Sequence, residues 1–257
     1  MGVKKEKNKW DQVFFDENNR VVNEENLFSS YWWKKHYRSI ACIGDSFIEN
    51  KPESKIIEVG CGSGKNTLLL DQPYKKATLV DISPNALRFA KKIAKLLYKE
   101  NKIETIEADM FDLPFKGGLY DLCWGVGVLE HYSKNKIIVA LGEMLRVTKR
   151  GGIVAIGFPN PNSLTFKKAK FLGDKRFYFL TKYLKGYRND TEIEYFPKQI
   201  IKIMQKAYTK KKLRFSIIYG GNITLVDTSK FIINMLKLLE RLFLKNKFIF
   251  FVKIEKL

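Results

Sequence analysis

The 257-residue sequence has few cysteines and histidines and lacks any long hydrophobic run. Its three cysteines, Cys42, Cys61 and Cys123, form neither a disulfide framework nor a metal-ligand spacing, so we expect reduced thiols, no metal ion and a cytoplasmic setting. No apolar stretch reaches the roughly 18 residues that a membrane-spanning helix needs. The segment MGVKKEKNKW at residues 1–10 also lacks the apolar core of a secretory signal.

The chain has a formal net charge of +20, and this charge is unevenly distributed. Residues 1–160 contain 25 Lys and Arg against 20 Asp and Glu, whereas residues 161–257 contain 22 against 7. A lysine-rich proteome would explain part of this excess. The asymmetry nevertheless favours an anionic partner on the C-terminal side, namely a phosphate-bearing substrate, a membrane surface or RNA.

Hydrophobic residues make up 45% of the chain and aromatic residues 14%, which is enough for a substantial core. From residue 55 onward, short apolar runs typical of buried strands alternate with segments of helical periodicity. Strands that are connected by helices in this way form a largely parallel sheet. The predicted strands are 55–59, 77–81, 103–108, 119–126, 152–158, 213–219 and 248–254.

Several helices are predicted from the signals at their ends. Asn23 is a suitable cap for a helix over 23–50, and Ser83 followed by Pro84 marks the start of another. A helix over 134–149 is expected to end against Gly151 and Gly152. Further helices are predicted at 66–70, near 197–208 and near 228–244.

The segment KIIEVGCGSGKN at residues 55–66 combines a strand, a glycine-rich turn and the start of a helix. A Walker-type phosphate loop requires G-x-x-x-x-G-K-[ST], but the spacing from Gly60 to Gly64 is too short and Asn66 replaces the magnesium-binding hydroxyl. A dinucleotide fingerprint requires a third glycine where this chain has Lys65. Neither nucleotide-binding interpretation is therefore favoured.

The remaining pattern, E-x-G-x-G-x-G, resembles motif I of the class I S-adenosylmethionine-dependent methyltransferases. Further segments resemble that family in the same order: LVDIS, EADMFDLPF, YDLCWGVGVLEHY and EMLRVTKRGGIVAIGFPN. The resemblance covers roughly residues 50–160, with a weaker similarity at 194–207. It implies a Rossmann-like, doubly wound α/β fold whose mostly parallel, seven-stranded sheet has helices on both faces, with an N-terminal helix and an insertion after the fifth strand.

This fold divides the chain into three regions. Residues 1–50 are expected to form an N-terminal helical cap, and residues 51–160 the core that binds S-adenosylmethionine. Residues 161–257 are expected to supply a basic insertion on the substrate side and the C-terminal strands of the same sheet.

The resemblance also implies roles for individual residues. Glycines permit close approach of the methionine part of the cofactor to the backbone. Glu58 and Gly125 are expected to support its amine, and Asp81 to accept hydrogen bonds from the ribose hydroxyls. Asp109 is expected at the edge of the adenine, beside apolar side chains. The implied cofactor-binding residues are Glu58, Gly60, Cys61, Gly62, Gly64, Asp81, Ile82, Asp109, Met110 and Gly125.

Some of these residues also have structural interpretations. Asp81 is able to cap the helix that begins at Ser83, and Asp109 is able to serve as a solvated acid at the end of a strand. Cys61 lies within the turn and is expected to matter through its backbone rather than as a reactive thiol.

His131, in the segment LEHY, is the expected catalytic residue, because enzymes similar to this chain place the position near the methyl group of the cofactor. It would act as a general base for an oxygen or nitrogen nucleophile. The alternative is an imidazole that holds a loop in place.

The expected function is transfer of a methyl group to a small or lipid-linked metabolite, because the DLPF and LEH segments resemble the branch of the family that acts on quinone precursors, sterols and sugars. Contact with an anionic membrane would fit the basic and aromatic residues at 161–190 and the apolar segment at 230–245. An RNA methyltransferase that uses the basic C-terminal half is the alternative, and a non-catalytic binding protein is the third. The absence of D/N-P-P-[FY] after the fourth strand argues against methylation of adenine in DNA.

Overall fold

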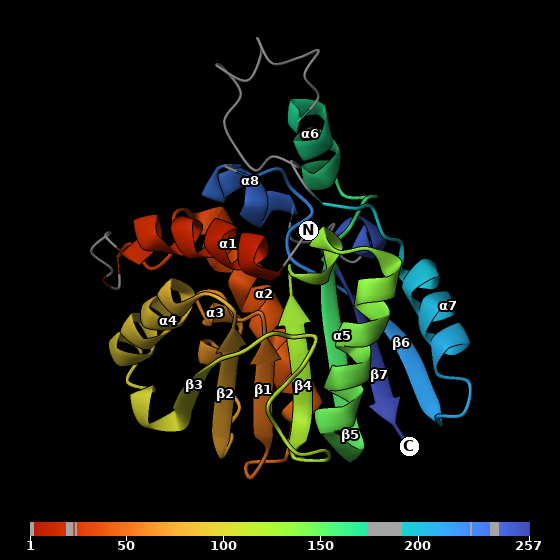
Figure 1. Ribbon diagram of the computed structural model, residues 1–257. Helices are drawn as coiled ribbons and strands as arrows, with labels where there is room; N and C mark the ends of the chain where they lie inside the picture. Colours follow the sequence, from red (N-terminus) through yellow and green to blue (C-terminus); the bar gives the residue numbers. More distant parts are fainter. Residues whose placement is uncertain (1–2, 19–22, 24, 174–191, 227, 237–241) are drawn as a thin grey trace.

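The computed structural model describes residues 3–18, 23, 25–173, 192–226, 228–236 and 242–257. Its strands form one seven-stranded sheet in the order β3-β2-β1-β4-β5-β7-β6 (Figure 1). Neighbours from β3 to β5 pair in parallel, whereas β7 is antiparallel to both β5 and β6. The strands are β1 (Lys55–Val59), β2 (Lys76–Asp81), β3 (Ile103–Glu107), β4 (Tyr120–Val126), β5 (Thr148–Pro159), β6 (Leu213–Gly220) and β7 (Ile249–Lys256). The predicted Rossmann-like α/β fold is confirmed.

Helices cover both faces of this sheet. On one face lie α5 (Lys134–Val147) and α7 (Pro197–Ala207), and on the other lie α2 (Tyr31–Ile48), α3 (Lys65–Leu68) and α4 (Pro84–Leu96). Successive strand residues point to opposite faces: Ile57 belongs to the core beneath α5, and its neighbour Ile56 belongs to the core beneath α2. Both faces of the central strands are therefore buried, which explains their continuous apolar runs.

Three further helices lie beyond the carboxyl ends of the parallel strands, namely α1 (Val3–Asn18), α6 (Leu164–Gly173) and α8 (Lys230–Met235) (Figure 1). Short 3-10 turns occupy Glu100–Lys102, Leu129–His131 and Leu244–Asn246. Within the described ranges, the helices are all too short or too polar to cross a membrane. Cys42, Cys61 and Cys123 are free thiols, as predicted.

The N-terminal helices differ from the predicted helix over 23–50. The helix begins only at Tyr31, with Ser30 as its N-cap. Asn23 does not cap it, because Asn23 and Asn26 instead accept hydrogen bonds from each other's backbone N–H, which forms a closed local turn. Helix α1, which precedes this turn, lies within the helical cap expected over residues 1–50, but its own bounds were not predicted.

The elements after α5 also correct several predictions. Helix α5 ends at Val147 and passes directly into β5, so Gly151 and Gly152 lie within the strand rather than at a helix end. Gly151 has φ +78° and lies where the β4–β5 register shifts, a bend that favours glycine. The helix predicted near 228–244 is limited to α8 within the described residues. The predicted basic stretch at 161–190 contains α6, and its part from 174 onward lies outside the described residues.

Candidate functional site

A cavity of about 810 Å³ opens at the carboxyl ends of β1, β2 and β4, beneath α1. The strand order reverses between β1 and β4, and open α/β sheets bind their ligands at such a switch point. Seven of the predicted site residues line the cavity: Gly60, Cys61, Gly62, Asp81, Ile82, Asp109 and Met110. Glu58, Gly64, Gly125 and His131 do not line it.

The glycine turn forms the floor of the cavity. Gly60, Gly62 and Gly64 all have positive φ, at +67°, +50° and +67°. A Cβ on Gly60 would lie 2.7 Å from Val128, and one on Gly62 would lie 2.9 Å from Phe14. The turn is held in place by hydrogen bonds from the Cys61 N–H to the Val80 carbonyl and from the Gly64 N–H to the Cys61 carbonyl, at 2.9 and 2.8 Å. Both the backbone conformation and the close packing therefore require glycine here.

Asp81, at the end of β2, connects this turn to helix α4. Its carboxylate accepts one hydrogen bond from the Gly62 N–H at 2.8 Å and another from the Ser83 N–H at 2.9 Å. Ser83 is itself the N-cap of α4. Burial raises the pKa of Asp81, although these backbone donors oppose the rise. Asp81 thus supports the helix entry, as its structural interpretation stated, and it also lines the cavity.

Apolar side chains surround the next part of the cavity. Ile82, Met110 and Phe111 line this region, together with the acid Asp109. The Asp109 carboxylate accepts a hydrogen bond from the Phe111 N–H at 3.0 Å, which fixes the loop after β3. The result is an apolar slot with one polar group, the arrangement expected for a flat heterocycle.

Glu58 lies beneath the cavity and is completely buried. Its carboxylate accepts hydrogen bonds from the Asn66 side-chain amide at 2.9 Å and from the Thr67 N–H at 3.2 Å. Burial raises the pKa of Glu58 to about 7, against the opposing effect of these two donors. Asn66 lines the cavity, and its Oδ1 atom has no hydrogen-bond partner among the described residues. Glu58 therefore orients Asn66, a residue that the sequence interpretation used only to exclude a Walker loop.

Two predicted glycines have packing roles. A Cβ on Gly64 would lie 2.9 Å from Leu79, between β2 and the helices, and one on Gly125 would lie 2.7 Å from the Val59 carbonyl oxygen. Gly125 itself does not line the cavity; the residues that follow it, Val126, Gly127 and Val128, do. Gly127 has φ +73° and donates its N–H to the Gly157 carbonyl at 3.0 Å.

His131 lies in the 3-10 turn after β4, next to Tyr132, which lines the cavity. Its ring contacts Trp10 edge-on, with centroids 5.2 Å apart. Burial, assisted by the charge of Lys9, lowers the pKa of His131 to about 4. The imidazole is therefore neutral near pH 7.

Helix α1 covers the cavity, and Trp10, Phe14 and Glu17 project into its lining. Asp11 fixes the helix to the start of α4, because its carboxylate accepts hydrogen bonds from the Ser83 hydroxyl at 2.8 Å and the Asn85 N–H at 3.0 Å. The sequence predicts a helical cap over residues 1–50 but not a separate helix at Val3–Asn18. The available signal was the pair Trp10 and Phe14, which are four residues apart and so share one face of a helix.

A cation lines the cavity near α2. The ammonium group of Lys65 lies 5.5 Å from the centre of the Tyr37 ring and 5.8 Å from that of Phe28. Burial lowers the pKa of Lys65. A positive charge among aromatic rings suits an anionic group of a ligand.

Residues 57–156 match a family model described as a methyltransferase domain. The 2-phytyl-1,4-naphtoquinone methyltransferase of Nostoc sp. is 33% identical over 122 residues, which are 46% of this chain and 52% of that protein. The tRNA (carboxymethyluridine(34)-5-O)-methyltransferase of Xenopus tropicalis is 28% identical over 117 residues, which are 43% of this chain and 16% of that protein. The matches thus span about half or less of these two relatives.

A solved structure is similar over the full chain. The magnesium protoporphyrin IX methyltransferase of Synechocystis PCC 6803, solved with bound SAH, has a TM-score of 0.61 and is 16% identical. The similarity covers 99% of each chain. At this identity the likeness shows a shared fold.

Proposed function

We propose that this chain is a class I S-adenosylmethionine-dependent methyltransferase and that it transfers a methyl group from that cofactor to a small or lipid-linked acceptor. The observation that carries the proposal is the cavity at the strand ends, whose lining combines the glycine turn, Asp81 and Asp109. S-adenosylmethionine carries a methyl group on a positively charged sulfonium. When a nucleophile attacks that methyl group in line, the sulfur is released as a neutral thioether. The protein has to bind the cofactor and the acceptor, orient the nucleophile behind the methyl group, and exclude water.

The residues that line the cavity fit each part of this cofactor. Asp81 would accept hydrogen bonds from the ribose hydroxyls, and Asp109 would contact the edge of the adenine within the apolar slot. The orphaned Oδ1 atom of Asn66 is a buried acceptor that suits the methionine amine. Glu58 would act on that amine through Asn66, rather than directly. Gly60, Cys61 and Gly62 would approach the methionine part through their backbone.

Binding of the cofactor tests the proposal directly. Calorimetric titration of the full chain with S-adenosylmethionine and with S-adenosylhomocysteine is expected to show saturable binding of both. A chain that binds neither compound would contradict the proposal and leave only a non-catalytic role for the fold. The role of His131 as a general base stays a prediction, and its neutral imidazole is the form that accepts a proton.

The docking of α1 leads to a first mutational prediction. Replacing Asp11 with alanine removes the acceptor that holds α1 to Ser83 and Asn85, so we expect affinity for S-adenosylhomocysteine to fall about tenfold, the effect of about 1.4 kcal/mol. Asp16→Ala is the matched control, because Asp16 is an exposed acid of the same helix. Equal affinities of both variants and the wild type, measured by calorimetry, would show that α1 does not contribute to cofactor binding.

A lipid-linked acceptor is favoured by apolar side chains exposed at the cavity end of the sheet. In α8, Phe231 is 76% exposed and Met235 57%, and Leu242 beyond it is 76% exposed. Helix α8 lies above the strand ends with α1 and α6 (Figure 1). Exposed apolar side chains beside lysines such as Lys230 suit the surface of an anionic membrane.

Cosedimentation with vesicles measures this preference. We expect the chain to bind vesicles that contain phosphatidylserine, and Phe231→Ser to reduce the partition coefficient about tenfold, because one large apolar side chain contributes about 1.5–3 kcal/mol on burial. Val139→Ser, which alters an exposed apolar residue of α5 away from this end, is the control. Identical vesicle binding by Phe231→Ser and the wild type would reject α8 as a membrane contact.

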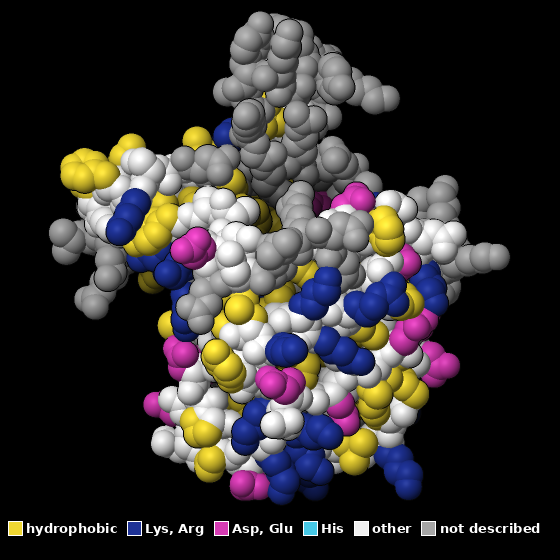
Figure 2. All heavy atoms as spheres, turned by 90° about the vertical axis from the view of Figure 1, so that its left-hand side faces the viewer, with side chains coloured by type: hydrophobic (Ala, Val, Ile, Leu, Met, Phe, Trp, Pro, Cys, Tyr) yellow, Lys and Arg dark blue, Asp and Glu magenta, His cyan; other side chains and the backbone are white. Residues whose placement is uncertain are grey.

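RNA is the second acceptor class, favoured by the net charge of +20. Lysine and arginine side chains are spread over the face formed by α4 and its neighbours (Figure 2), where Lys91, Lys92 and Lys95 are exposed. Acidic side chains lie among them. If the protein binds tRNA with an affinity that falls steeply with salt concentration, and does not bind vesicles, RNA is favoured over the lipid-linked acceptor.

A further inference from the structure

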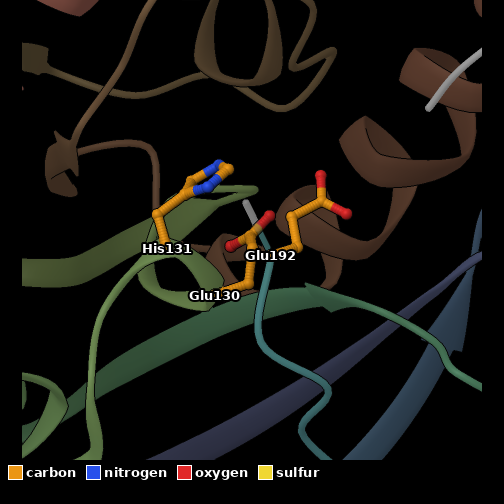
Figure 3. Close-up of side chains that lie close together, drawn as sticks. All are labelled: Glu130, His131 and Glu192. Carbon is orange, nitrogen blue, oxygen red and sulfur yellow. The ribbon is translucent and has the colours of Figure 1, made fainter. Parts of the chain in front are cut away.

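Three side chains with metal-binding groups come together beside the cavity. Glu130 and His131 belong to the 3-10 turn after β4, and Glu192 belongs to the segment that leads into α7. One ligand atom from each residue lies within 4.8 Å of the others. Figure 3 shows the Glu130 carboxylate between the other two side chains. The group is next to the proposed cofactor site, because His131 contacts Trp10, which lines the cavity.

The buried carboxylate of Glu130 is the observation that points to a ligand. This residue is only 3% exposed, and its Oε2 atom has no hydrogen-bond partner among the described residues. A buried carboxylate with one of its two oxygens unpartnered is unfavourable, and the neighbouring carboxylate of Glu192 adds like charge. A bound cation would remove both problems at once.

Backbone contacts hold the two segments together at this point. The Ile193 N–H donates to the Glu130 carbonyl at 2.8 Å, and the Tyr195 hydroxyl donates to the Tyr132 carbonyl at 2.9 Å. These bonds fix Glu192 opposite Glu130 independently of any attraction between their side chains. The approach of two carboxylates is therefore built into the fold.

We propose that Glu130, His131 and Glu192 form a binding site for a divalent metal ion. Two carboxylates and an imidazole are the oxygen and nitrogen donors that Zn²⁺ and Mn²⁺ accept. Ligand atoms around one ion at about 2.1 Å lie about 3.4 Å apart, so the three ligand atoms, which now lie within 4.8 Å of one another, would move closer together on binding. The sequence predicted no metal site because Glu192 is far from the LEH segment along the chain.

Metal binding at this site does not depend on the proposed function. A role of the metal ion in catalysis does rest on that function. An ion beside the cavity has open coordination positions for an acceptor oxygen, because only three protein ligands are present in the described residues. The assignment also gives His131 a role as a ligand in place of the predicted general base.

Metal binding is tested on the full chain without cofactor. After removal of metal with a chelator, equilibrium dialysis against Mn²⁺ and against Zn²⁺ is expected to show a single tight site for at least one of them. Glu130→Gln, Glu192→Gln and His131→Ala are each expected to weaken that binding at least about tenfold. Glu194→Gln is the matched control, because Glu194 lies in the same segment but pairs with Lys170.

Several outcomes would overturn the proposal. They are absence of metal binding in the wild type, unchanged binding in the Glu130→Gln and Glu192→Gln variants, or an equal loss in Glu194→Gln. Thermal unfolding of each variant shows whether it is folded, and Glu192→Gln provides a less buried test if Glu130→Gln does not fold. Titration of the same samples with S-adenosylhomocysteine keeps the two proposals separate, because metal binding without cofactor binding contradicts only the proposed function.

Discussion

Replacing Asp81 with alanine is expected to weaken binding of S-adenosylmethionine and S-adenosylhomocysteine by about 100-fold or more. The proposed hydrogen bonds from two ribose hydroxyls to this carboxylate contribute about 1.5–3 kcal/mol each, and about 2.8 kcal/mol corresponds to 100-fold. The variant also removes the acceptor for the Gly62 N–H, so the glycine turn loses one of its hydrogen bonds to β2. Calorimetric titration of both compounds measures the change.

Asp121→Ala provides the matched control for this prediction. Asp121 is also an aspartate of a central strand, but it accepts hydrogen bonds from the Lys55 N–H and the Lys149 ammonium at 2.8 Å, at the opposite ends of the strands. Its loss is expected to lower the free energy of unfolding without changing cofactor affinity. Near-wild-type affinity in Asp81→Ala, with a normal folded state, would show that the ribose assignment is wrong.

The parts of the site that the sequence predicted are those set by local chain geometry. Gly60, Gly62, Asp81 and Asp109 each lie at the carboxyl end of a parallel strand or in the loop after it, and these strand ends meet at one edge of the sheet. A correct strand order and a glycine turn are therefore sufficient to bring these residues to one cavity. For the antiparallel strands β6 and β7, the sequence predicted that the strands exist but not how they pair.

The parts that the sequence did not reveal depend on contacts between distant segments. Helix α1 takes its position from Asp11, whose partners Ser83 and Asn85 are more than 70 residues later in the chain. Glu192 lies opposite Glu130 because the Ile193 N–H donates to the Glu130 carbonyl, a contact that no periodicity indicates. From the sequence, Glu58 is expected to support the cofactor amine, but its contact with Asn66 was not predicted, because a strand-end acid cannot be distinguished from a buried one by sequence.

Glu58 is expected to make the stability of the protein depend on pH in an unusual direction. Its pKa is about 4.5 in the unfolded chain and is raised to about 7 by burial in the folded chain. Between these two values the folded state binds more protons than the unfolded state, so stability falls as the pH rises. We expect a loss of about 3 kcal/mol from this residue between pH 4.5 and 7, and no further loss from it above about pH 8.

The Glu58→Gln variant isolates this effect, because glutamine keeps the size and one acceptor atom of the side chain but does not ionise. The free energy of unfolding of the wild type and the variant is measured by urea denaturation at several pH values, without cofactor. Other titrating groups are common to both proteins, so the difference between the two curves reports Glu58. We expect the stability of Glu58→Gln relative to the wild type to increase as the pH rises. The control Glu53→Gln, at an exposed position, is expected to show the same dependence of unfolding free energy on pH as the wild type. A difference that is constant with pH would show that Glu58 has the same proton affinity in both states, and that Asn66 and Thr67 fully compensate its burial.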